Sequence, residues 1–442
     1  MDYPSALFLS RLQFAFTVSF HIIFPALSIG LASFLAVLEG LYLYTRQSVY
    51  RGLYLFWIKI FSLCFGLGVI SGVVLSYQIG TNWSLFSDKV SNVIGPLLGF
   101  EVLTAFFLES SFLGIMLFGW GRVTEKMHFT STLIVAFGTI LSAFWILSVN
   151  SWMQTPQGFS VLADGRLIPE DWFAIVFNPS FPYRLVHMLL GAYLATAFFV
   201  GGVSSYFLLK KKCLEYSKIG LMMSILMATV VGPLQMFVGD LHGLNTFEHQ
   251  PCKVAAIEGI WETEKGAGLR LIAWPNMAEE KNDFEISIPY LSSLILTHSF
   301  EGEVPGLKNW PKEDRPHVAT VFYSFRIMVG IGILMVALGY WSAYAAYRKK
   351  LFECRPILWS WVAMGGSGII AILCGWFVTE VGRQPYTVYG VLRTTHSVTP
   401  ALQSPEVFWS LATFVIVYTL IFGGGMYYLF RQIQKGVPDY AH

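Results

Sequence analysis

Charged residues are scarce in this sequence. Of its 442 residues only 13% are Asp, Glu, Lys or Arg, whereas soluble domains contain about 25%. Because 55% of the residues are hydrophobic and the mean hydropathy is +0.58, an ordinary soluble fold is excluded. The formal net charge of +2 is too small to indicate a nucleic-acid partner.

Cysteine motifs are missing as well. The five cysteines are scattered, with no C-x-x-C pair and no C-x-x-C-H. The sequence therefore indicates neither a zinc site nor a covalently attached c-type haem. The N-terminal segment MDYPSALFLSRLQF lacks a charged region before its apolar run and a clear cleavage site, so we expect no signal peptide there.

Long apolar runs are abundant. A bilayer core of about 30 Å needs roughly 20 apolar residues per helix. Runs of this kind lie near residues 14–42, 53–77, 94–118, 129–150, 185–209, 218–239, 318–342, 356–379 and 406–430. They predict an all-α, polytopic integral membrane protein with about nine transmembrane helices.

Lysine and arginine predict the orientation of these helices. The basic clusters occupy alternate connections and the C-terminal segment: Arg46 and Arg51; Arg122 and Lys126; Lys210 to Lys212 with Lys218; Arg348 to Lys350 with Arg355; Arg431 and Lys435. Short cytoplasmic loops carry the excess of Lys and Arg. We therefore expect the N-terminus outside and the C-terminus in the cytoplasm.

One hydrophilic segment is long, residues 240–317, and it falls on the outer side in this topology. It carries most of the acidic residues outside the apolar runs, together with several prolines. A loop of this length between closely spaced helices is usually functional.

Ionisable residues inside the apolar runs are candidates for function, because burying them in hydrocarbon is costly. His21 in the first run and His187 in the fifth are two such candidates. The alternative for His21 is a hydrogen bond to a neighbouring helix, and the alternative for His187 is a position at the membrane interface. Glu101 and Glu109 lie about 12 Å apart along one helix. This pair suggests a proton relay or a metal site, unless nearby hydroxyls satisfy the carboxylates.

Four further residues stand out in the apolar runs or at their ends. Met328 is ordinary core in most proteins, but Arg326 two residues earlier requires an anionic partner, such as a carboxylate or a haem propionate. Lys59 can extend its amine to the interface. Glu380, at the outer end of the eighth run, can serve as a ligand or simply pair with Arg383.

These residues converge in the predicted topology. His21, Glu101, His187, Arg326, Met328 and Glu380 come from at least five helices, yet all fall in the outer half of the membrane. Imidazole and thioether form an axial pair for haem iron, and a lone histidine or carboxylate leaves a position open for a gas. The pattern favours one haem-binding transmembrane domain spanning residues 1–442.

Several stretches carry a resemblance to a known family, in that family's order: SRLQFAF, FGLGVISG followed by GTNWS, FFLESSFLG, LSAFWILSVNSWMQTP, KVAAIEGIWET, FRIMV and GWFVTEVGRQPY. Over essentially its whole length the chain resembles the large, haem-bearing subunit I of cytochrome bd-type quinol oxidases. The segment 240–317 corresponds to that family's quinol-binding Q-loop, and its length resembles the short Q-loop branch.

The resemblance implies a set of haem ligands. His187 and Met328 would ligate a low-spin haem b, with Arg326 beside it favouring the reduced state. His21 and Glu380 would ligate two high-spin haems, and which residue serves which haem stays open. Trp376 would pack near these two haems.

The cofactors implied are two haem b, one low-spin and one high-spin, and one haem d. Some short-loop members carry only b haems, so a third haem b in place of haem d stays open. The motif ends in GRQPY where the family usually has GRQPW. Tyr386 keeps an aromatic ring there, so we expect the loop containing Arg383 to retain its role.

The resemblance also implies the reaction. Lys253 and Glu258 match the quinol-binding positions, so quinol would be oxidised at the outer face. Protons for water formation would come from the cytoplasm by a route involving Glu109, with Glu101 and Lys59 as further members. The result would be a proton gradient without a dedicated pump, in a bacterial cytoplasmic (inner) membrane.

The implied partners are a second transmembrane subunit (subunit II), a small single-span subunit, membrane lipid, O2, and ubiquinol or menaquinol. Two other functions compete with this interpretation. A proton-coupled transporter would explain the buried ionisable residues without haem, but this chain shows no repeat-related broken helices. A cytochrome that only relays electrons would not need the additional candidate ligands His21 and Glu380.

Overall fold

The computed structural model describes residues 3–437. In that range nine helical segments are long and apolar enough to cross a membrane, in agreement with the nine predicted runs. The first six segments are Ala6–Thr45 (α1), Ser48–Thr81 (α2), Ser84–Phe118, Glu125–Gln154 (α5), Trp172–Leu209 and Leu214–His249 (α8). The third segment consists of α3 (Ser84–Phe100), the π-helix η1 (Glu101–Phe106) and α4 (Phe107–Phe118). The fifth segment contains α6 (Trp172–Val176) and α7 (Phe181–Leu209).

The last three segments are Lys312–Tyr347 (η3, Lys312–Asp314; α11, Val318–Tyr347), Arg355–Val381 (α12, Arg355–Met364; α13, Ser367–Val381) and Ser404–Lys435 (α14). Local sequence explains several boundaries. The Thr124 hydroxyl accepts the Met127 N–H at the start of α5, and Gln403 and Glu406 form a capping box at the start of α14.

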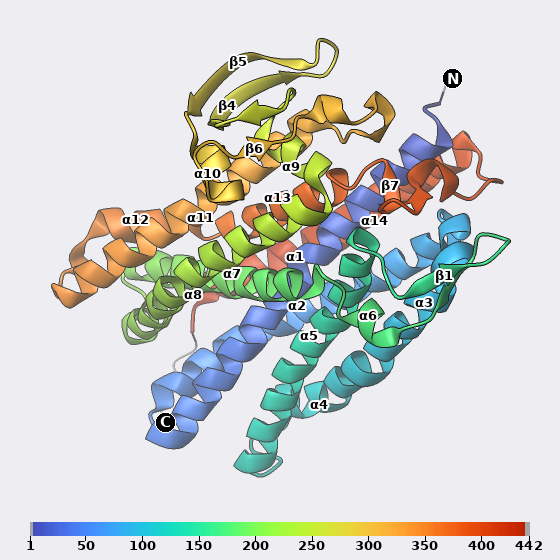
Figure 1. Cartoon of the computed structure of the whole chain (residues 1–442). Coiled ribbons are helices and arrows are strands. Elements are labelled where there is room, and N and C mark those ends of the chain that lie inside the picture. Colours follow the sequence, from blue (N-terminus) through green and yellow to red (C-terminus); the bar gives the residue numbers. More distant parts are fainter. Residues whose placement is uncertain (1–2, 438–442) are drawn as a thin grey trace.

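The helices pack around α1 and α7. α1 contacts α2, α5, α7 and α14, while α7 also contacts α8, α12 and α13 (Figure 1). Gly30 of α1 allows a close approach to α7, because a Cβ atom at this position would lie 2.0 Å from Oγ1 of Thr196. The interior is therefore formed mainly by helices from the first two thirds of the chain, joined by α13.

The bundle has two unlike ends, which we call the loop end and the basic end. The loop end carries the connection between α8 and α11, and the basic end carries the Lys/Arg clusters between α1 and α2, α4 and α5, α7 and α8, and α11 and α12. The 3₁₀ turn η4 (Leu351–Glu353) also lies at the basic end.

Within residues 3–437, four antiparallel two-stranded sheets supplement the helices. Their strands are β1 (Phe159–Val161) with β2 (Leu167–Pro169), β3 (Glu264–Lys265) with β6 (Glu303–Val304), β4 (Leu269–Asn276) with β5 (Lys281–Ile288), and β7 (Tyr386–Val388) with β8 (Leu392–Arg393). All belong to connections at the loop end, as do α9 (Pro251–Glu258), α10 (Leu291–Thr297), η2 (Leu307–Asn309) and η5 (Thr394–His396).

The long hydrophilic segment is compact and structured. Its first ten residues, 240–249, continue α8, and the remainder forms α9, the β4–β5 hairpin, α10 and short turns at one side of the loop end (Figure 1). A helix can extend past the hydrocarbon once polar residues are solvated, so the apolar run marks the membrane crossing rather than the end of the helix.

Candidate functional site

His187 lies on α7 near the loop end, with an imidazole that is only partly satisfied. Its Nε2 is 3.4 Å from the side-chain amide nitrogen of Gln235 on α8, and its buried Nδ1 has no partner among the described residues. The ring lies against Gly239, where a Cβ atom would be 3.2 Å from the His187 Cε1. A buried imidazole nitrogen without a partner is suited to a ligand.

Met328 lies on α11, which packs against α13. Its Sδ is 3.0 Å from the position that a Cβ atom on Gly375 would occupy. One turn earlier on α13, Ile372 faces Gly191 of α7, and Gly191 also faces Gln235. The helices α7, α8, α11 and α13 are thus in contact at glycine positions, where little side-chain bulk separates them.

His242 is a residue that our sequence analysis missed. It lies on α8 with its ring centroid 5.5 Å from that of His187, and its buried Nε2 has no partner among the described residues. The spacing of Gln235, Gly239 and His242 places all three on one helix face. We assigned His242 to the hydrophilic loop because the apolar run ends at 239, and the helical spacing was the signal that could have identified it.

His21 lies at the packed interface of α1 and α2. Its Nδ1 is 3.2 Å from the Ser71 hydroxyl, and its Cε1 is 3.0 Å from the position of a Cβ on Gly72. Trp376 of α13 packs with the apolar cluster that joins α1, α5 and α7. The two predicted residues therefore occupy the bundle interior on neighbouring elements.

Glu380 is the centre of a polar network at the loop end of α13. Its Oε1 accepts hydrogen bonds from the side-chain amides of Asn150 (2.9 Å) and Gln154 (3.4 Å), both on α5. Its other oxygen is paired with Arg383, and the Arg383 side chain is buried. The pairing with Arg383 considered from the sequence is therefore present, and the role of Glu380 as a ligand stays a prediction.

Two buried arginines near Glu380 have N–H groups without partners among the described residues: Nε of Arg184 on α7, and Nε and Nη1 of Arg383. An unpaired buried guanidinium is expensive, so such groups normally face an anion. The donors fit the carboxylates of a cofactor such as the propionates of haem, and together with His187, His21 and Met328 they give this interior the donor set that a haem protein requires.

Lys253 connects this network to the loop. It is 2% exposed on α9, and its Nζ donates a 2.7 Å hydrogen bond to Oε1 of Gln154, whose amide contacts Glu380. Burial, reinforced by the charges of Arg184 and Arg383, holds the pKa of the Lys253 amine well below its usual range. A weakly basic, buried amine at this position can exist without a proton.

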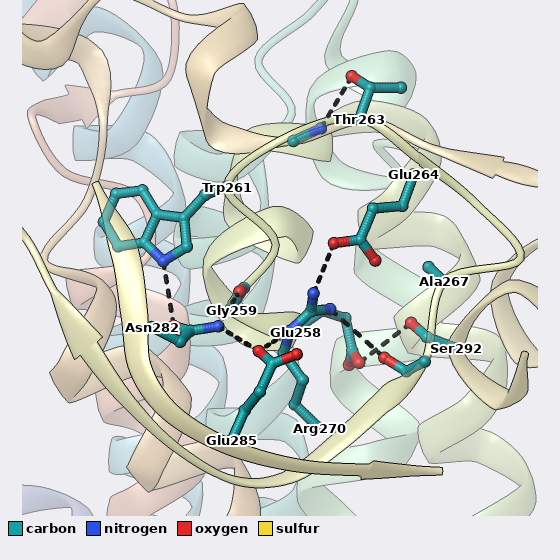
Figure 2. Close-up of polar contacts among 12 residues, drawn as sticks. Glu258, Gly259, Trp261, Thr263, Glu264, Ala267, Arg270, Asn282, Glu285 and Ser292 are labelled. Carbon is teal, nitrogen blue, oxygen red and sulfur yellow. Dashed lines mark hydrogen bonds and ion pairs between the residues drawn. The ribbon is translucent and has the colours of Figure 1, made fainter. Parts of the chain in front are cut away.

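Glu258 ends α9 and faces a different set of residues (Figure 2). It is 5% exposed, its Oε2 accepts a 3.1 Å hydrogen bond from Ser292, and the same oxygen lies 3.8 Å from Nη2 of Arg326. Burial raises the pKa of the Glu258 carboxyl, and the charges of Arg326 and Arg270 oppose this effect only in part. The Glu258 carboxylate is therefore a stronger base than an exposed carboxylate, which suits it to accept a proton.

Arg326 joins α11 to the loop. Its Nε donates to the Arg270 carbonyl at 2.8 Å, its Nη1 donates to the Ile257 carbonyl, and its guanidinium lies 3.7 Å above the Phe322 ring. Lys253 and Glu258 do not contact one another: Lys253 faces the Glu380 network, and Glu258 faces Arg326.

An open hollow of about 400 Å³ lies elsewhere at the loop end, lined by Lys89 and by residues of the β1–β2 and β7–β8 hairpins.

Glu101 and Glu109 both face α5. The Ser142 hydroxyl donates a 2.9 Å hydrogen bond to Glu101, and the Glu109 Cγ is only 2.6 Å from the position of a Cβ on Gly138. Glu101 begins the π-helix η1, an irregularity that is frequent at functional sites. The predicted pair is thus aligned along the helix that also carries Asn150.

A second cluster on α5, near the basic end, escaped the sequence analysis. Glu39 of α1 and His128 of α5 are 1% and 3% exposed and form a 2.6 Å contact, and Thr132 donates to the other Glu39 oxygen at 2.6 Å. Glu39 lies inside a predicted run, and only tertiary contacts reveal its partner. Lys59, by contrast, is exposed on α2, with no hydrogen bond to Glu101 or Glu109 among the described residues.

Fold and site together define a polytopic membrane protein whose interior holds buried imidazole and guanidinium groups without partners among the described residues. Comparison with known proteins agrees. The family profile "Cytochrome bd terminal oxidase subunit I" matches residues 9–437. The chain belongs to this family of membrane terminal oxidases, which confirms the predicted enzyme class, a quinol:oxygen oxidoreductase of the bacterial cytoplasmic membrane.

Individual relatives cover nearly the whole chain. It is 37% identical to "Cytochrome bd ubiquinol oxidase subunit 1" of Bacillus subtilis over 99% of this chain and 96% of that protein. It is 34% identical to "Cytochrome bd-II ubiquinol oxidase subunit 1" of Escherichia coli, covering 97% and 96%. A solved bd oxidase structure from Geobacillus thermodenitrificans superimposes with a TM-score of 0.91 at 30% identity, covering 99% and 100%.

Proposed function

We propose that this subunit oxidises quinol at the loop end, on the outer side of the membrane, and supports reduction of O2 to water at a high-spin di-haem site inside the bundle. The observation that carries the proposal is that the buried, unpaired Nδ1 of His187 and the buried, unpaired N–H groups of Arg184 and Arg383 occur in the same bundle interior as Glu380. This combination suits a cofactor that is both metal-bearing and anionic.

The haem ligands follow from these side chains. His187 and Met328 would hold a low-spin haem b, and His21 and Glu380 would hold two high-spin haems, one b-type and the other haem d or a third haem b. Bound haem supplies one-electron redox chemistry and open iron positions for O2. Arg383 and Arg184 would neutralise the propionates, and Trp376 would exclude water beside the high-spin pair.

Quinol oxidation is assigned to α9 and its neighbours. Glu258, with its raised pKa, would accept a proton from the quinol hydroxyl, while Lys253 would orient the ring oxygen that faces the Glu380 network. Arg326 would hold Glu258 in place and, two residues from Met328, favour the reduced state by its positive charge. The protons would leave at the outer side, because α9 lies at the loop end.

Protons for water formation would travel along α5 from the cytoplasmic side. Gly138, Ser142 and Asn150 of this helix face Glu109, Glu101 and Glu380, at separations of about 6 and 12 Å along the axis. The Glu39–His128 pair would lie at the entry. Lys59 would join this route only if a partner subunit covers its exposed surface.

Release on one side and uptake on the other would generate a proton gradient without a dedicated pump. The working enzyme would include a second transmembrane subunit and a small single-span subunit. Its quinone would be ubiquinone or menaquinone: relatives carry both names, including a 28% identical "Putative cytochrome bd menaquinol oxidase subunit I" of Bacillus subtilis.

A redox difference spectrum tests the proposal. The complex purified in detergent should show reduced-minus-oxidised haem bands, with a far-red band shifted by carbon monoxide if haem d is present. A response to carbon monoxide in b-type bands alone would replace haem d with a third haem b. A folded preparation without haem would refute the proposal.

The ligand assignment has a matched pair of variants. Met328→Leu should remove or strongly shift the low-spin signal while the high-spin bands persist, because leucine cannot ligate iron. Met335→Leu, two turns further along α11 in the apolar core, should leave the spectrum unchanged. An unaltered low-spin signal in Met328→Leu would show that another residue is the ligand.

A further inference from the structure

The β4–β5 hairpin of the loop has an inverted distribution of polar and apolar residues. In a soluble hairpin the apolar face packs on the protein and the polar face meets water. Here the polar face contacts the protein, and the apolar face is directed outward.

The inner face is held by polar contacts (Figure 2). Arg270, 6% exposed, bonds Glu285 at 2.8 Å and Glu264 at 2.5 Å. Asn282 donates to the Gly259 carbonyl at 2.9 Å and accepts from the Trp261 indole at 3.0 Å. These bonds fix the hairpin against α9, so its orientation is determined by well-satisfied polar groups.

The outer face consists of large apolar side chains. Trp274 is 67% exposed, Phe284 is 58% exposed, and Ile272 and Ile286 are paired across the strands with more than two fifths of each exposed. The full set is Leu271, Ile272, Trp274, Phe284, Ile286 and Ile288. A contiguous apolar surface of this kind on a well-ordered hairpin marks a contact with an apolar phase or partner.

The position of the hairpin along α11 identifies that phase. The Tyr323 hydroxyl donates to the Ala273 carbonyl at 2.8 Å, and Arg326 donates to the Arg270 carbonyl. Counting about 20 residues back from Ser342, where the apolar run 318–342 ends, places the hydrocarbon boundary near Phe322. The hairpin therefore contacts α11 close to this boundary, where the acyl chains meet the lipid headgroups.

The outer face of the hairpin is continuous with the lipid-facing surface of the bundle. On α11, Ile327 is 47% exposed and directly follows Arg326, which binds the hairpin. The hairpin lies beside the loop end of α11 at the margin of the bundle (Figure 1). Charged groups cluster at the turn instead, where Lys281 pairs with Glu279.

We propose that the outer face of the β4–β5 hairpin lies in the headgroup–acyl boundary of the leaflet at the loop end, with phospholipid as its ligand. Tryptophan, phenylalanine and isoleucine are favoured at this depth, whereas exposing them to water is costly. The hairpin thus anchors the loop to the bilayer surface. This inference rests on the membrane fold and not on the assignment of haem or quinol sites.

Depth-dependent fluorescence quenching tests the anchor. The intact complex, carrying Trp274→Cys or Phe284→Cys with Cys213 and Cys354 replaced by serine, is labelled with a fluorophore and reconstituted in phosphatidylcholine vesicles. Asp164→Cys, at the exposed turn between β1 and β2 of the same end, is the matched control. An unchanged haem or absorbance spectrum reports that each variant is folded.

We expect lipids with a doxyl group high on the acyl chain to quench labels at 274 and 284 more strongly than aqueous iodide does, and the reverse at 164. Iodide quenching equal to that of the control would overturn the proposal, because the face would lie in water. Protection from both quenchers would overturn it as well, because a protein would then cover the face.

Discussion

At the scale of single residues, Glu258 shows how burial and a facing cation act together. Burial raises the pKa of its carboxyl, and Arg326 at 3.8 Å and Ser292 at 3.1 Å lower it in part. The balance leaves a carboxyl that titrates above its ordinary range, and such perturbed groups are concentrated at functional sites.

The first prediction concerns the pH dependence of quinol oxidation. As the pH falls through the raised pKa of Glu258, the carboxyl gains a proton and can no longer accept one from quinol, so kcat/KM should decline on the acid side. Glu258→Gln should lower kcat/KM by about 10²-fold or more and abolish this acid limb. Steady-state oxygen consumption over a pH series measures both effects.

The matched control is Glu301→Gln, on the exposed surface of the same loop. It should keep both the rate and the pH profile of the wild type. If the acid limb persists in Glu258→Gln, another group is the proton acceptor, and the role assigned to Glu258 is wrong.

At the scale of helices, the Glu39–His128 contact joins α1 to α5 near the basic end. Thr132 binds the second Glu39 oxygen, and the Tyr54 hydroxyl lies 3.2 Å from that of Thr132. All four side chains come from three helices, α1, α2 and α5. Because these four side chains depend on one another for hydrogen bonds, the cluster specifies how the helices pack.

The second prediction is a loss of stability when this cluster is broken. Glu39→Ala leaves His128 and Thr132 without their acceptor in a buried site, which should cost about 3 kcal/mol or more. Thermal unfolding of the purified complex, followed by loss of the haem spectrum, should show a clearly lowered Tm. Equal melting of variant and wild type would mean that water or a partner subunit satisfies these groups.

Glu125→Ala provides the comparison. Glu125 lies one turn before His128 on α5 and pairs with Arg46 at 2.7 Å, but both side chains are more than half exposed. Exposed pairs contribute little, because water and salt screen them. This variant should melt close to the wild type.

The helices could be predicted from the sequence better than their connections. Nine apolar runs suffice to identify nine spans, because the hydrocarbon thickness fixes their length. The β4–β5 hairpin was not predicted. Its strands place Arg270 inward, toward the protein, and Trp274 outward, the reverse of a strand that packs on a soluble core. A hairpin with this inverted polarity cannot be recognised from its sequence until the fold is known.

Candidate ligands were predicted, but the groups around them were not. His187 and Glu380 stand out as polar residues in apolar runs. Their neighbours His242 and Arg184 lie at run boundaries, where polar residues are expected and carry no signal of their own. Only the packing of α5, α7, α8 and α13 reveals that these groups are buried with unpaired nitrogen atoms.

At the scale of the whole molecule, the helices differ in how much of their surface this chain covers. Only 17% of the apolar window of α14 is buried, compared with 67% for α1. α14 packs mainly on α1 and α2, and Gly423 and Gly424 have open space where side chains would project. Small residues on an open helix face permit close approach of another membrane helix.

The last prediction is that subunit II covers α14. A photoreactive phenylalanine analogue in place of Leu420, which is 70% exposed on α14, should cross-link to the second subunit in native membranes. The same analogue in place of Leu334, 58% exposed on α11, should not, because α11 packs on α8, α13 and the loop, whereas α14 packs on α1 and α2. Mass spectrometry of the cross-linked bands identifies the partner. Cross-links from position 334 but not 420 would place subunit II against α11, where it would also cover the β4–β5 hairpin and compete with the lipid contact.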